Sequence, residues 1–90
     1  MSRLRVGNIP NSVLVPDEPI RDRRLSPADL GVYVRFVYAS TMWTDPDLDI
    51  LVRELHMPRE ETEAALKRLV ALEYLEVVPI RSSGDVEEGH

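Results

Sequence analysis

The sequence has 90 residues, of which 43% are apolar and 30% are charged, with a net charge of −5 and no cysteine. This composition indicates one soluble globular domain and excludes a disordered chain, a disulfide framework, a thiolate metal site and a thiol nucleophile. Because no apolar run approaches the roughly 20 residues that span a bilayer, and the first residues lack the pattern of a signal peptide, we expect a cytoplasmic protein.

The first predicted segment is an N-terminal arm over residues 1–24. Alternating apolar residues at 4–6 and β-branched residues at 13–15 predict one or two short strands. Pro16 and Pro19 predict that no helix crosses the end of this segment, because proline lacks a backbone N–H and clashes with the preceding turn of a helix. The arm carries five arginines against three acids, whereas the rest of the chain carries six basic and thirteen acidic residues. The sequence thus predicts a basic arm attached to an acidic body.

The first predicted helix begins at Pro27. Ser26 is a typical N-cap, Pro27 suits the first helical position, and Asp29 occupies the capping-box position three residues after the cap. Five apolar residues then follow at helical spacing: Leu30, Tyr33, Val34, Val37 and Tyr38. Propensity alone favours a strand over residues 32–39, but the cap and the spacing favour a helix with apolar surface on more than one side.

Two further helices are predicted. The second starts at a cap formed by Thr44 or Asp45 and ends near residues 56–58. Its apolar stripe consists of Leu48, Leu51, Val52 and Leu55. Pro58 opens the third helix, which has acids in its first turn and ends before Tyr74. Its apolar side consists of Ala65, Leu66, Leu69, Val70 and Leu72.

The remaining residues predict a small β element. Residues 75–80 have the pattern of a strand, residues 81–85 that of a turn, and residues 86–88 that of a brief returning strand. Three helices, of which the last two are joined by a tight turn and followed by such a wing, have the element order of a winged helix-turn-helix.

Residues 48–75 carry the skeleton of that arrangement. A short helix precedes a turn with Met57 as its apolar anchor, a longer helix follows, and the pair Tyr74 and Leu75 leads into the wing. On these features the sequence resembles the winged helix-turn-helix family of bacterial regulators and replication initiators, over roughly residues 8–80. The resemblance implies an α+β fold, mostly α with a small β-sheet.

The resemblance also implies a domain organisation. The arm at residues 1–24 would precede a winged helix-turn-helix core at 25–81 and a flexible tail at 82–90. Two positions where the family often has glycine carry His56 and Glu73 here. Glu73 must therefore end the third helix without the freedom that glycine has at positive φ.

The resemblance implies that the third helix is a recognition helix, which enters the major groove of double-stranded DNA by its N-terminal part. The predicted DNA-binding residues are Arg59, Glu63, Lys67 and Arg68 on this helix, Arg81 in the wing, and Arg3 and Arg5 in the arm. Arginine can bind guanine or phosphate, and glutamate can accept a hydrogen bond from the cytosine amino group. Acids balance the basic residues of the helix, so attraction to phosphate depends on the other arginines. The predicted function is DNA binding in transcription or replication regulation.

The same charge balance leaves open a second hypothesis, a module that binds protein and not DNA. Val32, Phe36 and Trp43 lie on a second side of the first helix, and large aromatic residues are enriched in interface cores. They either complete the core of a small domain or form the interface of a homodimer or a protein complex. A two-fold dimer is compatible with DNA binding, because it presents two recognition helices to two half-sites.

The sequence lacks the patterns of catalytic and metal sites. His56 and His90 are its only histidines. Asp45, Asp47 and Asp49 are followed by neither the glycine nor the distal glutamate of a calcium-binding loop. No glycine-rich phosphate loop or catalytic triad can be drawn. We therefore expect no enzyme activity, no cofactor, and neither metal nor membrane as a partner.

Overall fold

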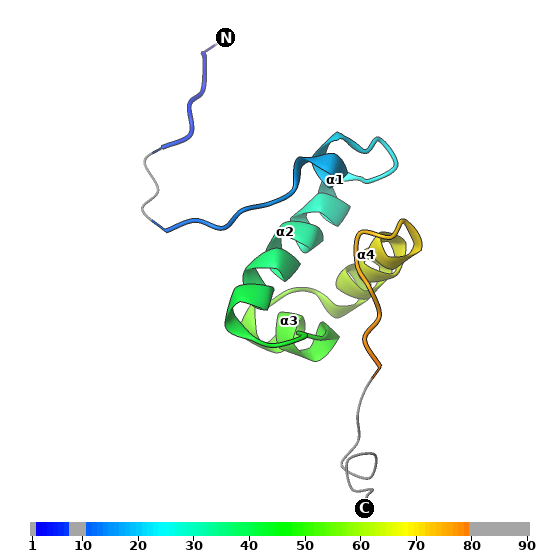
Figure 1. Cartoon of the computed structure of the whole chain (residues 1–90). Helices are drawn as coiled ribbons and strands as arrows, with labels where there is room; N and C mark the ends of the chain where they lie inside the picture. Colours follow the sequence, from blue (N-terminus) through cyan, green and yellow to red (C-terminus); the bar gives the residue numbers. More distant parts are fainter. Residues whose placement is uncertain (1, 8–10, 80–90) are drawn as a thin grey trace, which may run out of the picture.

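The computed structural model describes residues 2–7 and 11–79 and is helical (Figure 1). These residues form four helices, α1 (Asp17–Arg21), α2 (Pro27–Met42), α3 (Leu48–Glu54) and α4 (Arg59–Ala71). The longest helix, α2, packs mainly against α4, and α3 closes the core by contacting both. Helices α2, α3 and α4 correspond to the three helices predicted from the sequence.

The expected α+β fold with a small β-sheet is wrong, because the described residues contain no strand. Residues 4–6 and 13–15 lie outside any helix or strand, and Leu4 and Leu14 are 96% and 94% exposed. Residues 75–79 likewise belong to neither a helix nor a strand. A strand is stable only when a neighbour pairs with its backbone, and apolar alternation does not supply that neighbour. The turn predicted for the wing and its returning strand lie outside the described residues.

Helix α1 contradicts the prediction that two prolines keep the end of the arm free of helix. Pro16 occupies the N-cap position and Pro19 falls in the first turn of the helix. The first N–H groups of a helix have no acceptor within it, so a proline at these positions loses no hydrogen bond. Pro19 is also buried, which anchors this short helix to the body.

The predicted start of α2 is confirmed. The Ser26 hydroxyl accepts from the Asp29 backbone N–H at 3.0 Å, and the Asp29 carboxylate accepts from the Ser26 N–H at 3.0 Å. The side of α2 that faces the core carries Asp29, Val32, Tyr33 and Ala39. Val34 and Tyr38, which belong to the apolar stripe read from the sequence, are exposed.

Helix α3 begins later than predicted. Its N-cap is Asp47, whose carboxylate accepts from the Ile50 N–H at 2.9 Å, and not Thr44 or Asp45. Asp45 instead adopts a left-handed conformation with φ of 48° and leads into a buried Pro46. A start at Asp47 points Leu51 into the core, where its side chain has no exposed surface.

The turn between α3 and α4 is held by its backbone. His56 has a φ of 56°, and the Met57 N–H donates to the Leu51 carbonyl at 3.3 Å. Met57 is buried, as its predicted role of anchor requires. His56 ends α3 at positive φ, and residues 55–58 join α3 to α4. We use the name helix-turn-helix unit for α3, these four residues and α4.

Glu73 ends α4, and its backbone adopts the left-handed region with a φ of 68° although it is not a glycine. Its N–H donates to the Val70 carbonyl at 3.0 Å, and the Tyr74 N–H donates to the Leu69 carbonyl at 2.9 Å. These two bonds form a Schellman motif, which usually has glycine at the left-handed position. The core of the domain lies between α2, α3 and α4. Its fully buried leucines are Leu51 and Leu69.

Candidate nucleic-acid interface

Helix α4 has one side in the core and the opposite side in solvent. Thr62, Ala65 and Leu69 are buried, and the hydroxyl of Thr62 has no hydrogen-bond partner. The exposed residues opposite them, here called the outer face of α4, are Glu60, Ala64, Lys67 and Ala71. All four predicted DNA-binding residues of the helix are exposed, with Lys67 on the outer face and Arg59, Glu63 and Arg68 beside it.

Two of the predicted DNA-binding cations form exposed ion pairs. Arg59 Nη2 lies 2.6 Å from Asp49 Oδ1 on α3, and Lys67 Nζ lies 3.8 Å from Glu63 Oε2 one turn earlier. The Arg59 hydrogen bond lowers the pKa of Asp49 below its ordinary value. Exposed pairs contribute little to stability, so both cations can exchange a carboxylate for another anion.

Arg68 has a structural contact instead. Its Nη1 lies 2.5 Å from Oδ1 of Asp29, whose side chain is only 4% exposed. Burial alone raises the pKa of Asp29, but the Ser26 backbone N–H and the Arg68 charge outweigh burial, so the pKa lies below its ordinary value. Asp29 thus caps α2 and holds α4 through a single carboxylate. The sequence indicated the cap but not the partner 39 residues away.

A second set of polar contacts fixes the segment that follows α4. The Tyr74 hydroxyl donates to Asp22 Oδ2 at 2.6 Å, and Arg24 Nη2 lies 2.6 Å from the same oxygen. Hydrogen bonds from Arg24 and Tyr74 hold the pKa of Asp22 well below its usual range, and the bond to Asp22 raises the pKa of Tyr74. The Tyr74 ring meets Tyr33 edge to face, with centroids 6.4 Å apart. These contacts join the end of the arm to the end of α4.

The remaining predicted DNA-binding residues are not brought together with α4. Arg3 and Arg5 are exposed in the arm, which leads away from the helical body (Figure 1). Arg81 lies outside the described residues. Sequence reasoning missed Arg35 and Arg53, which are exposed on α2 and α3. Arg35 lines a hollow of about 450 Å³ together with residues of the turn between α3 and α4. Both arginines lie in helices that the sequence predicted, so a projection of those helices could have identified them as exposed.

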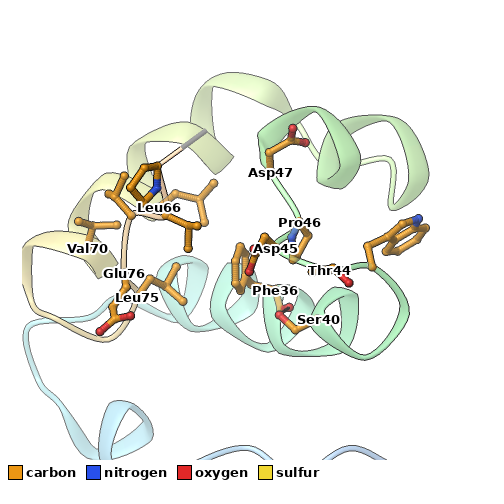
Figure 2. Close-up of a pocket in the computed structure, with 14 residues that line it drawn as sticks. Phe36, Ser40, Thr44, Asp45, Pro46, Asp47, Leu66, Val70, Leu75 and Glu76 are labelled. Atoms are coloured by element: carbon orange, nitrogen blue, oxygen red, sulfur yellow. Dashed lines mark hydrogen bonds between the residues drawn. The ribbon is translucent and has the colours of Figure 1, made fainter. Parts of the chain in front are cut away.

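An open groove of about 890 Å³ lies between α2, α4 and the segments that follow them. Figure 2 shows Leu66, Val70 and Leu75 on one side of the groove and Phe36 and Pro46 on the other. The other lining residues are Ser40, Trp43, Thr44, Asp45, Asp47, Glu76, Val77, Val78 and Pro79. We call this hollow the apolar groove.

The three residues predicted for a protein interface have different positions. Val32 is 8% exposed and belongs to the core. Phe36 and Trp43 are partly buried, pack against the core and also line the apolar groove. Each of these two aromatic residues therefore packs against the core on one side and lines the open groove on the other.

In the part of the chain that the structure describes, His, Asp and Glu side chains form no group of three that could hold a metal ion. Within the same residues, every helix is too short or too polar to cross a membrane. Comparison of the chain with models of protein families, with curated proteins and with solved structures gives no match.

Proposed function

We propose that this protein binds double-stranded DNA through α3, the turn and α4, and acts in the cytoplasm as a regulator of transcription or replication. The observation that carries the proposal is the pair of helices α3 and α4 joined by residues 55–58, in which left-handed His56 ends α3 and α4 presents an outer face to solvent. Helices presented in this way fit the major groove of DNA. Ala64 and Ala71 have small side chains, so part of that face would let the helix backbone approach the bases closely.

The charged residues beside the turn supply the phosphate contacts in this proposal. Lys67 would exchange Glu63 for a phosphate, and Arg59 would exchange Asp49 for a phosphate or for guanine. Arg53 pairs with its neighbour Glu54 at 3.2 Å and can make the same exchange. Arg68 takes no part, because its guanidinium holds the buried Asp29 carboxylate. Glu60 on the outer face would accept from a cytosine amino group, which contributes sequence preference and not affinity.

The affinity of the purified protein for a fluorescent DNA duplex, measured by anisotropy at several salt concentrations, tests this function. We expect binding at low salt that weakens steeply as salt rises. Lys67→Ala should lower the logarithmic salt slope by about one, because one phosphate contact is lost. The matched control is Arg21→Ala, which removes the same charge from an exposed ion pair on α1 and should leave the slope unchanged. No binding at low salt, or equal effects of the two variants, would overturn the proposal.

A second candidate function is protein binding without DNA, and the apolar groove favours it. Val77 and Val78, which line this groove, are 76% and 50% exposed. Contiguous exposed apolar surface of this kind marks interaction sites in soluble proteins. The two functions use different surfaces, since the groove lies on the flank of α4 formed by Leu66 and Val70 and not on its outer face.

A further inference from the structure

The apolar groove has an acidic margin. Its apolar floor includes Phe36, Leu66 and Leu75, while Asp45 and Glu76 line it with exposed carboxylates. Asp47, the N-cap of α3, adds a third exposed acid. No arginine or lysine is among the described residues that line the groove. A ligand that fits must combine apolar side chains for the floor with positive charge for the margin.

The N-terminal arm of this chain has that chemistry. Residues 3–6 read Arg-Leu-Arg-Val and belong to neither a helix nor a strand. When such a segment binds in an extended conformation, successive side chains point to opposite sides, so Leu4 and Val6 share one side and the two arginines share the other. Leu4 is 96% exposed and Val6 is 81% exposed. Arginine side chains are long enough to bend toward carboxylates on either margin while the leucine and valine enter the groove.

We propose that the apolar groove binds residues 3–6 of a second copy of this chain. The arm leaves its own body at α1, next to the start of α2, whereas the groove lies at the C-terminal half of α2 (Figure 1). Each copy thus presents an arm away from its own groove. Reciprocal exchange of two arms uses the same two surfaces on both copies and closes as a two-fold dimer. The proposal does not depend on DNA binding, because neither surface includes the outer face of α4.

Sedimentation of the full chain over a range of concentrations, without DNA, tests the proposal. We expect a dimer, and we expect Leu4→Asp/Val6→Asp to raise its dissociation constant more than about 100-fold, since two buried apolar side chains are lost. Both positions are exposed within the arm, so the helical body should remain folded, as circular dichroism would show. The matched control is Leu14→Asp, which alters an equally exposed arm residue outside the bound segment and should leave the dimer intact.

Mixing two variants separates exchange from other modes of association. Val77→Asp changes an exposed residue of the groove and should also give a monomer. An equimolar mixture with Leu4→Asp/Val6→Asp restores one intact arm and one intact groove, so a weak dimer should reappear. A monomeric unmodified protein, a dimer that survives the arm variant, or a mixture that stays monomeric would each overturn the proposal. A dimer that survives the arm variant would indicate a different interface, and a monomeric unmodified protein is the result expected if the arm docks in its own groove.

Discussion

Replacement of Leu69 by alanine should lower the free energy of unfolding by about 3 kcal/mol, within the range found for leucine truncations in well-packed cores. Leu69 has no exposed surface and lies on the side of α4 that faces the core. A domain this small has a narrow margin of stability, so the loss should lower the melting temperature by more than about 10 °C. Thermal and urea denaturation followed by circular dichroism measure both quantities.

Leu14→Ala is the matched control for the Leu69 prediction. It removes the same atoms from a side chain that is 94% exposed in the arm, and it should change the free energy of unfolding by less than about 0.5 kcal/mol. Equal effects of the two substitutions would contradict the placement of α4 against α2.

Replacement of Asp29 by alanine should cost about 2–3 kcal/mol of unfolding free energy. Its carboxylate accepts from the Ser26 N–H and from Arg68, so the substitution removes half of a capping box and a charge-assisted hydrogen bond together. Asp29→Asn keeps an oxygen for the cap but removes the charge, and should cost less. If both variants are as stable as the unmodified protein, the carboxylate does not join α2 to α4.

The loss of unfolding free energy caused by Asp29→Asn should also depend on pH. The pKa of Asp29 is lower in the folded chain than its ordinary value of 3.8, so its charge stabilises the folded state above that pH. As pH falls through the lower folded-state value, the carboxylate is protonated and the stabilisation is lost. The difference in stability between the two proteins should therefore be constant near neutrality and narrow below about pH 4. A difference that does not change with pH would contradict the ionic contact.

Local signals in the sequence predicted much of the helical body. Ser26, Pro27 and Asp29 marked the start of α2, because a capping box depends only on residues three positions apart. Glu73 was expected to end the third helix, and it ends α4 with a φ of 68°. The apolar spacing in α4 placed Lys67 outward and Leu69 inward, because a helix repeats every 3.6 residues whatever surrounds it.

The errors concern features that depend on distant residues. A strand needs a partner, so the apolar pattern at residues 4–6 and 75–79 was not sufficient to form a sheet. Pro19 lies in the first turn of α1, where the general rule against proline in helices does not apply. The Arg68–Asp29 pair spans two helices, so a cation expected to bind DNA holds the fold together. The apolar groove is likewise formed by segments that only folding brings together.

The most direct measurement of DNA contact is a titration of ¹⁵N-labelled protein with a DNA duplex, followed by amide chemical shifts. We expect the largest changes at Glu60, Ala64 and Lys67 on the outer face of α4 and at Arg53 before the turn. Residues that line the apolar groove, such as Phe36 and Leu75, should change little, because they lie on another side of the helices. Shifts confined to the groove, or no shifts at low salt, would contradict DNA binding by the helix-turn-helix unit.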